Sequence, residues 1–448
     1  MAKIRNPIIM VAGTGGGGGG DITNSTTVTK PASGSVTANS YLKLNENYVQ
    51  LPISSYTYIT NPKFTFQLTG SRFLLMANTG SSTDWLLQLC EKSGFDFSVI
   101  TTISTGAYLY SSCNFIQEDS ENFTVFYNDG QSYIKYFRFS LVGNILTITQ
   151  QPTGLNPATK AYDYNNGQCD VVKLDTDKYL HIAPYYNNNA RIIDTSSNTV
   201  IVSTTWSSGY TYLTGGCKII DYDTTKALIL YGRQSNLYGA IGRLDIDLTN
   251  NTLSFTTLFQ PSNTNILPRL DYSNYVLSFV KSMGNYTYFL IIGLYVIKLV
   301  FASDYSSVTA TRPSNIGTYA HAWYYDLGNN KVLAMMTYGN TKWAIVYTFN
   351  SDGTVSTQTV QATQQTTQAG METVIILTDD NTRYIAPTIY GDNNSYPRKA
   401  WTVDVNNGVP TWYSGVAMLS SNSDTIYGVS KNSASDGENV QVMIPDVT

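Results

Sequence analysis

An all-β fold built from a repeated four-strand unit is predicted by three features of this 448-residue sequence. The first is composition, because 42% of the residues are hydrophobic and only 13% are charged, which allows a buried core. The second is the alternation of Tyr, Val, Ile and Thr with polar residues, a period of two that suits strands. The third is the clustering of Asn, Gly, Asp and Ser between the apolar runs, where tight turns require them.

A repeat of about 50 residues organises these strands. Each unit reads as a strand, a polar turn, a second strand, a loop, a third strand, an Asn/Gly turn and a fourth strand. The start of the second strand marks the units most clearly, and it falls at Phe73, Phe123, Tyr179, Ala227, Tyr286, Val332, Tyr384 and Thr425. The second hairpin closes on residues that tolerate positive φ, at 142–144, 196–198, 249–252, 351–354 and 406–408.

Four strands repeated at this period are typical of a β-propeller blade. Eight markers predict about eight blades, or seven if residues 271–317 or the final unit are misread. The final unit lacks a strand after residues 439–444, and residues 48–54 supply a spare one. We therefore expect residues 48–54 to complete the last blade and to close the ring, so that no strand edge is exposed. The propeller would span 41–448, and residues 1–40 would form a Gly-rich N-terminal arm.

The arm contains an unusual stretch, PIIMVAGTGGGGGGDITNS, at residues 7–25. It matches the G-x-G-x-x-G pattern, but a dinucleotide site also needs a helix immediately afterwards, and β-branched and turn residues follow instead. The apolar run is too short for a signal peptide. We interpret the stretch as a tether or assembly joint, and the candidate anchor residues are Ile8, Ile9, Met10, Gly15 and Gly18.

Cysteines and histidines have structural interpretations here. Cys113, Cys169 and Cys217 each precede a second strand by ten residues, so they occupy one position of the repeat. Their spacing matches no zinc motif, and together with Cys90 they are expected to be buried free thiols. His181 and His321 stand apart in the sequence and are expected to serve packing or loop polarity. We predict no metal and no cofactor.

Carboxylates recur at the turn before the second strand, at Asp119, Asp175, Asp177, Asp221, Asp223, Asp326, Asp379 and Asp380. Because Asp side chains cap tight turns, this periodicity predicts a structural role and no catalytic residue. A glycosidase would instead need two carboxylates that face each other in one pocket. The residues to test for that alternative are Asp170, Asp271, Glu372 and Asp404.

The loops between second and third strands repeat Tyr followed by Gly, Asn or Asp, and in a propeller they share one face with the connections between blades. Aromatic rings and amides on such a face suit sugars or adaptable protein contacts, although the same residues are also common in turns. The candidate ligand-binding residues are Tyr127, Asn128, Asp129, Tyr185, Tyr186, Asn187, Trp206, Tyr231, Trp323, Tyr338, Asn340, Tyr390, Asp392 and Asn393.

Charge and hydropathy argue against two classes of partner. The net charge of −4 and the absence of a basic stripe speak against nucleic-acid binding. The most apolar stretch, residues 286–302, is interrupted by Gly293 and Lys298 and alternates like two neighbouring strands. It is shorter than the roughly 20 residues of a membrane-spanning helix, so no membrane insertion is expected.

The leader MAKIRNPIIMVAGTGGGGGGD is similar to the Gly-rich N-termini of bacteriophage virion proteins, and the low-charge Tyr/Asn/Thr/Ser-rich body resembles phage tail or head fibres and adhesins. The resemblance implies a non-enzymatic virion protein whose arm docks to other virion proteins and whose propeller faces the host. It implies a homo-oligomer, assembled in the host cytoplasm, that binds host surface glycans with avidity. The alternatives are a glycan-degrading propeller hydrolase and a ligand-free decoration or scaffold protein.

Overall fold

The computed structural model describes residues 25–31, 35–36, 38, 41–45, 48–50, 64–68, 72–78, 85–93, 96–109, 113–129, 133–159, 169–183, 190–205, 217–232, 239–260, 266–267, 277–292, 295–315, 321–338, 341–351, 354–361, 376–377, 383–388, 399–406, 409–412, 416–419, 428–430, 433–435 and 439–445. Every regular element among these residues is a strand. The predicted all-β class is therefore confirmed.

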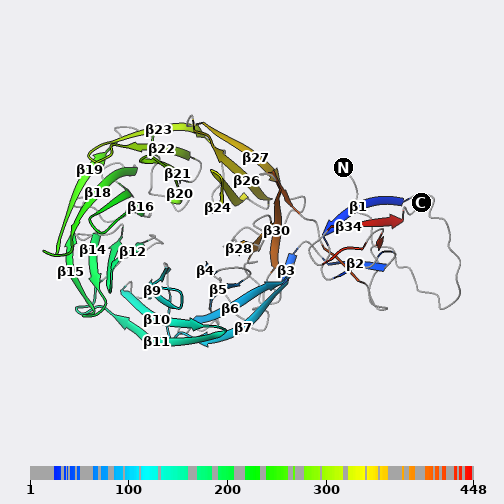
Figure 1. The fold of residues 1–448 in the computed structure, drawn as a ribbon, viewed down its shortest axis with the longest axis horizontal. Helices are drawn as coiled ribbons and strands as arrows, with labels where there is room; N and C mark the ends of the chain where they lie inside the picture. The colour runs from blue at the N-terminus through cyan, green and yellow to red at the C-terminus, as the bar shows by residue number, and fades with distance from the viewer. Residues whose placement is uncertain are drawn as a thin grey trace.

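Six four-stranded antiparallel sheets are arranged around a ring, as blades of a β-propeller (Figure 1). In chain order, blades 1 to 6 are β4 (Phe64–Gln67), β5 (Arg72–Asn78), β6 (Trp85–Ser93) and β7 (Asp96–Ser104); β8 (Cys113–Gln117), β9 (Asn122–Asn128), β10 (Ile134–Val142) and β11 (Ile145–Gly154); β12 (Asp170–Asp175), β13 (Lys178–Ile182), β14 (Ala190–Asp194) and β15 (Thr199–Thr204); β16 (Lys218–Tyr222), β17 (Lys226–Gly232), β18 (Gly239–Asp247) and β19 (Thr252–Phe259); β20 (Leu277–Gly284), β21 (Thr287–Ile292), β22 (Tyr295–Phe301) and β23 (Val308–Asn315); and β24 (His321–Gly328), β25 (Lys331–Tyr338), β26 (Thr341–Phe349) and β27 (Val355–Gln361).

The second strand of each blade begins within one residue of its predicted marker. For example, β9 begins at Asn122, one residue before Phe123, and β21 begins at Thr287, one residue after Tyr286. The turns between third and fourth strands also hold the predicted residues, because Gly143, Asn198 and Asn251 have φ of 60°, 58° and 52°. The 50-residue repeat therefore marks real blades as far as blade 6.

A seventh sheet, here called the closing sheet, completes the ring. It contains β28 (Ile376–Leu377), β29 (Arg383–Thr388) and β30 (Lys399–Asn406). The outer edge of β30 is shared by two segments from distant parts of the chain. β31 (Val409–Trp412) pairs with Val403–Asn406, and β3 (Tyr48–Gln50) pairs with Lys399–Trp401.

The predicted position of the N-terminal strand is wrong. Residues 48–54 were expected beside 439–444, whereas Val49 pairs with Ala400. The physical reason is the shortness of β31. Its four residues cover one half of β30 and leave the other half for β3.

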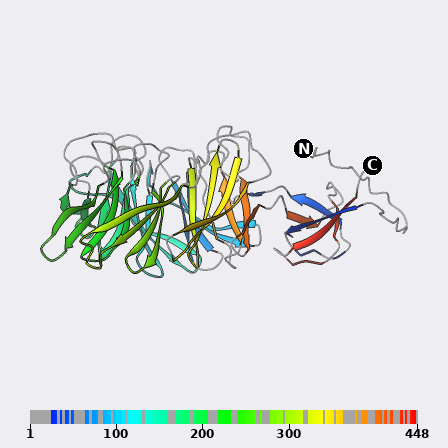
Figure 2. The ribbon, with the colours of Figure 1, turned by 90° about the horizontal axis from the view of Figure 1, so that it is seen from above.

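A further sheet of five strands contains segments from both ends of the chain and is here called the end sheet. Its order is β1 (Ser25–Pro31), β34 (Asn439–Pro445), β33 (Gly428–Ser430), β2 (Tyr41–Asn45) and β32 (Val416–Leu419). Figure 2 shows this sheet to one side of the ring. The prediction of eight blades is therefore wrong, because strands assigned to the eighth blade belong to the end sheet. Its marker, Thr425, lies outside the described residues.

The division into an arm at 1–40 and a propeller at 41–448 also differs from the structure. The ring strands run from β3 to β31, between residues 48 and 412, and β1 and β2 lie in the end sheet with the C-terminal strands. The ring is thus an insertion between two halves of one small sheet. The reason the repeat could not show this is that end-sheet strands alternate like blade strands.

Neighbouring blades pack through aromatic residues at their interfaces. The rings of Phe126 in blade 2 and Tyr179 in blade 3 lie 4.8 Å apart, centroid to centroid. The rings of Phe289 in blade 5 and Phe349 in blade 6 lie at the same distance. Each such pair contributes about 0.5–1.5 kcal/mol beyond the burial of its area.

A polar contact also joins each neighbouring pair of the six blades. These contacts are Arg72 to the Gly143 carbonyl, Arg138 to Asp177, Lys218 to Asp170, Tyr288 to Asp221, and Lys281 to Asp326. All come from strands or from the turns between first and second or third and fourth strands. Those turns lie at one end of the blades, here called the turn face.

Candidate functional site

The predicted ligand-binding residues fall into three groups. Eight lie outside the described residues: Tyr185, Tyr186, Asn187, Trp206, Asn340, Tyr390, Asp392 and Asn393. Trp323 and Tyr338 lie in β24 and β25, where the structure describes the backbone alone. The remaining four, Tyr127, Asn128, Asp129 and Tyr231, are all buried. The anchor residues Ile8, Ile9, Met10, Gly15 and Gly18 are also outside the described residues.

The four buried residues have interior partners. Asn128 Nδ2 donates to Cys169 Sγ at 3.6 Å, and Asp129 Oδ1 accepts from the Tyr133 backbone N at 2.9 Å. The Tyr231 hydroxyl lies 3.0 Å from Thr257 Oγ1. Tyr127 is 3% exposed and belongs to the core shared by blades 1 and 2. These residues are therefore core residues and not members of an exposed face, because the second strand is covered by sheets on both sides.

A groove of about 610 Å³ lies among the first strands of blades 2, 3 and 4, and is here called the channel groove. Figure 1 shows β12 and β16 on the inner side of their blades, toward the centre of the ring. The groove is lined by Gln117 from β8, Lys173 and Asp175 from β12, and Tyr222 from β16. Tyr222 is 44% exposed, so its ring is open to solvent beside the groove.

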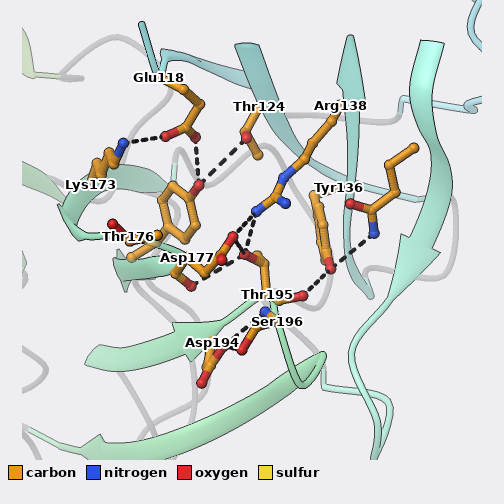
Figure 3. Close-up of polar contacts among 12 residues, drawn as sticks. Glu118, Thr124, Tyr136, Arg138, Lys173, Thr176, Asp177, Asp194, Thr195 and Ser196 are labelled. Carbon is orange, nitrogen blue, oxygen red and sulfur yellow. Dashed lines mark hydrogen bonds and ion pairs between the residues drawn. The ribbon is translucent and has the colours of Figure 1, made fainter. Parts of the chain in front are cut away.

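Lys173 is held in the groove by an interblade contact. Its Nζ lies 2.6 Å from Glu118 Oε2, and the Tyr179 hydroxyl donates to Glu118 Oε1 at 2.5 Å (Figure 3). Burial and the adjoining Glu118 raise the pKa of Tyr179 to about 12, so its hydroxyl keeps its proton and continues to donate. Glu118 therefore fixes the ammonium of Lys173 at the wall of the channel.

A second network lies beside the first, between blades 2 and 3. Arg138 Nη2 donates to Asp177 Oδ1 at 2.5 Å and to Thr195 Oγ1 at 2.6 Å (Figure 3). The Tyr136 hydroxyl donates to the Thr195 carbonyl at 3.0 Å. Burial lowers the pKa of the Arg138 guanidinium, but the hydrogen bond that it donates to Asp177 and its interactions with Tyr179 together raise that pKa. This network joins blades 2 and 3, and its polar groups bond to one another, so they are poorly placed to bind a ligand.

The predicted capping role of the periodic carboxylates is confirmed for Asp119, Asp223 and Asp326, whereas the Asp177 side chain binds Arg138 instead. Asp119 Oδ1 accepts from the backbone N of Glu121 and of Asn122, both at 2.9 Å. Asp223 Oδ1 accepts from the backbone N of Thr225 at 2.6 Å. Hydrogen bonds of this kind lower the pKa of both carboxyls, although burial opposes the shift at Asp223. Asp379 and Asp380 lie outside the described residues.

Of the four acids named for the hydrolase alternative, only the side chain of Asp170 is among the described residues. Asp170 is 6% exposed, accepts from the Ile219 backbone N at 2.9 Å and lies 3.1 Å from Lys218 Nζ. It therefore links blades 3 and 4. Asp404 lies in β30, where the backbone alone is described, and Asp271 and Glu372 are not described.

The described histidine and three of the four thiols agree with the sequence interpretation, whereas Cys113 was expected to be buried and is half-buried. All four cysteines are free, and Cys90, Cys169 and Cys217 are buried. Burial raises the pKa of Cys90 to about 12. His181 is 2% exposed, and burial lowers its pKa, so it is a neutral core residue. Among the described residues there is no cluster of three metal-ligating side chains and no helix that could cross a membrane.

Comparison with known proteins finds similar solved structures but no family for this chain. No protein-family model matches the chain, and no curated protein matches it. One solved structure from Lactobacillus plantarum has 10% identity and a TM-score of 0.44, over 75% of this chain and 96% of that one. A putative 6-phosphogluconolactonase from Bacteroides uniformis has 11% identity and a TM-score of 0.45, over 74% and 92%. A puromycin hydrolase has 11% identity and a TM-score of 0.43, over 88% and 59%.

Sequence reasoning missed the channel groove. Tyr222 stands between Asp221 and Asp223 in a stretch that was interpreted only as a turn. The signal that could have found it is the end of the first strand, because in a propeller this position faces the channel. The groove offers an exposed ring, an amide, a carboxylate and a fixed ammonium, which suits a hydroxyl-rich ligand better than an apolar one.

Proposed function

We propose that this chain is a non-enzymatic structural protein of a bacteriophage virion, of the tail or fibre type, that attaches by its ends and displays the propeller outward. The observation that supports this most is that strands from both ends of the chain share the end sheet, outside the ring. The Gly-rich leader immediately precedes β1 of that sheet. One body would thus carry attachment to other virion proteins, and the other would carry exposure to the host.

The ring suits a rigid display platform, and we count the closing sheet as its seventh blade. The outer edge of β30 is covered by segments that lead directly to the end sheet, so the ring is joined to that sheet at two adjacent points. Two connections restrict the swing of the ring more than one would. Chemical recognition is assigned to the channel groove, where Tyr222 and Gln117 would contact sugar rings and hydroxyls of host glycans.

The engaged carboxylates favour a binding role over a hydrolytic one. Backbone N–H groups donate hydrogen bonds to the carboxylates of Asp119, Asp223 and Asp170. Side chains of the neighbouring blade form ion pairs with Glu118 and Asp177. A glycosidase would need carboxylates free to protonate or attack a glycosidic bond. In a homo-oligomeric particle, weak single sites would be multiplied by copy number.

Deletion of residues 2–20 tests the attachment role. Because this segment precedes every described strand, the truncated chain is expected to fold as before and to be lost from purified particles. The measurement is an immunoblot of particles from infected cells that express the variant. The matched control is full-length Tyr222→Ala, which is expected to enter particles normally. If the truncated chain enters particles as well as the control does, the attachment role of the leader is wrong.

A further inference from the structure

Two tyrosines on the turn face have backbone conformations that this residue type rarely adopts. Tyr286, between β20 and β21, has φ of 59°, and Tyr305, between β22 and β23, has φ of 58°. Positive φ is common for Gly and tolerated by Asn and Asp, but for a bulky side chain it is an outlier. Such residues persist where the surrounding structure holds them, and they cluster at functional sites.

The repeat shows that blade 5 departs from its neighbours here. The residue immediately before the second strand is Asp177 in blade 3 and Asn330 in blade 6, with φ of 57° and 58°. Both types tolerate this conformation. At the equivalent position blade 5 has Tyr286, preceded by Gly284 and Asn285, which also have positive φ. A large aromatic side chain therefore stands where the turn itself favours a small polar one.

Hydrogen bonds hold both strained residues in place. The Phe301 backbone N donates to the Tyr286 carbonyl, and the Tyr305 backbone N donates to the Ala302 carbonyl, both at 2.9 Å. Arg243 of blade 4 donates from Nη1 to the Tyr305 carbonyl at 3.0 Å. Asp245 in turn fixes Arg243, with Oδ1 2.9 Å from Nε. Two blades thus cooperate to present these tyrosines.

The two rings form a small aromatic shelf at the surface. They pack edge to face, with centroids 5.3 Å apart and an angle of 80° between the ring planes. Tyr305 packs on Phe301 at 5.7 Å between ring centroids, and Phe301 packs on Tyr288 at the same distance. The Tyr288 hydroxyl in turn donates to Asp221. Tyr286 is 40% exposed. One ring is therefore anchored in the protein while the other remains available to solvent.

Polar groups surround the shelf. Lys226 Nζ lies 5.9 Å from the centroid of Tyr305, and no ion pair to Lys226 is formed within the described part of the chain. Asp304 is exposed, and its Oδ1 accepts from the Ser306 backbone N at 2.9 Å. Hydrogen bonds from Ser306 lower the pKa of Asp304, so the carboxylate is charged at neutral pH. An ammonium donor and a carboxylate acceptor thus lie beside Tyr305, whose ring packs against the exposed ring of Tyr286.

We propose that Tyr286, Tyr305, Lys226 and Asp304 form a second binding site, for a neutral saccharide, on the turn face between blades 4 and 5. The apolar face of a pyranose ring would stack on Tyr286, and its hydroxyls would bond to Asp304 and Lys226. The site takes a neutral sugar because two carboxylates accompany the single ammonium of Lys226. Asp223 Oδ1 accepts from the Lys226 backbone N at 2.8 Å, and Asp304 directly precedes Tyr305, so an acidic sugar meets excess negative charge. This proposal rests on the proposed function for its setting, namely a displayed ring that binds glycans.

Saturation-transfer NMR on the isolated full-length chain tests the site, with cellopentaose, chitopentaose and trigalacturonate as probes. We expect transfer to at least one neutral pentasaccharide and none to trigalacturonate. Tyr286→Gly removes the ring and fits the left-handed backbone, so it is expected to weaken binding at least about tenfold, equivalent to 1.4 kcal/mol. Its Tm is expected to equal or exceed that of the parent. Val142→Ala, at a residue of blade 2 that is 52% exposed and lies in neither site, is the control and leaves this binding unchanged.

Three results would overturn the proposal: no transfer to either neutral probe, binding by trigalacturonate alone, or unchanged affinity in Tyr286→Gly. If Tyr286→Gly lowers the Tm, Asp304→Asn decides, because this exposed residue can still cap its turn as Asn. Affinity must then fall in Asp304→Asn, and an unchanged affinity overturns the site. The assay uses no particles, so its failure is distinguishable from failure of the attachment role.

Discussion

The turn before the second strand makes an interblade contact in blade 3 and presents an exposed ring in blade 5. In both blades a tyrosine two residues further on donates to a carboxylate of the preceding blade, Tyr179 to Glu118 and Tyr288 to Asp221. In blade 3 the residue of positive φ, Asp177, binds Arg138 of the neighbouring blade at 2.5 Å. In blade 5 its counterpart, Tyr286, remains 40% exposed.

This difference separates two roles of a repeated position. The tyrosine and the carboxylate belong to the frame, by which we mean the contacts that hold neighbouring blades together. The ring needs such contacts at every interface. The turn residue is free to vary once the frame is secure, so blade 3 uses it for a further interblade bond and blade 5 uses it for a surface ring. Function in a repeat fold is therefore sought where one unit departs from the others at the same position.

The largest effect on stability is expected from the aromatic residues between blades, at the interface of blades 2 and 3 and at that of blades 5 and 6. Phe126→Ala and Phe289→Ala each remove a ring that is 1% exposed. Each is expected to lower the free energy of unfolding by about 3–5 kcal/mol. Urea denaturation followed by tryptophan fluorescence measures this. Equal losses would support a common frame, and a loss confined to one interface would break the comparison.

A smaller effect is expected from the interblade hydroxyls. Tyr179→Phe and Tyr288→Phe each remove one hydrogen bond to a carboxylate and keep the ring. Because a hydrogen bond to a charged group contributes about 1.5–3 kcal/mol, each variant is expected to lose about that much. The same denaturation experiment applies, with Tyr222→Phe at the exposed groove as the control. If neither Tyr179→Phe nor Tyr288→Phe lowers the free energy of unfolding, these hydrogen bonds do not stabilise the interfaces between blades.

The turn residues themselves are expected to behave oppositely. Asp177→Gly removes the partner of Arg138 in a half-exposed ion pair, and the loss is expected to be about 1 kcal/mol. Tyr286→Gly relieves a strained backbone, which offsets the aromatic contact it removes, so stability stays within about 0.5 kcal/mol of the parent. Thermal unfolding compares the two. Equal destabilisation would show that both turns serve only the frame.

The smallest effect is an alkaline loss of stability. Burial and Glu118 raise the pKa of Tyr179 to about 12, above its unfolded value of roughly 10. The folded state therefore holds this proton more tightly, so its contribution is complete below about pH 10 and falls as the pH rises toward 12. Urea midpoints at pH 8 to 11 should decline less in Tyr179→Phe than in the parent. Parallel declines would contradict the shift.

Much of the frame could be predicted from the sequence, because blade strands repeat at a fixed distance and their turns need Gly or Asn. Phe123 and Tyr179 mark true second strands, and Asn198 and Asn251 have the expected positive φ. The last unit could not be resolved. Strand alternation around Thr425 is the same whether a strand pairs within a blade or with β1, and pairing partners depend on chain geometry.

The binding residues were harder to predict. Tyr127 and Tyr231 follow the Tyr-rich loop pattern but end up inside the blades, because the second strand runs further than the pattern indicates. Tyr222 ends β16 and Tyr286 lies in the turn before β21, at the opposite end of the blades, where the sequence pattern predicts only turn and strand-start residues. Their exposure depends on which neighbour fills the space beside them, and a single sequence does not contain that information.

The account depends most on β3 pairing with β30 in the closing sheet and on β3 and β31 both leading to strands of the end sheet. Val49 lies directly opposite Ala400 in the closing sheet. Antiparallel partners of this kind can be joined by a disulfide. Oxidised Val49→Cys/Ala400→Cys should therefore yield the linked peptides by mass spectrometry, whereas Val49→Cys/Val440→Cys should not. A disulfide in the second pair, and none in the first, would contradict the fold on which the end sheet and the proposed attachment rest.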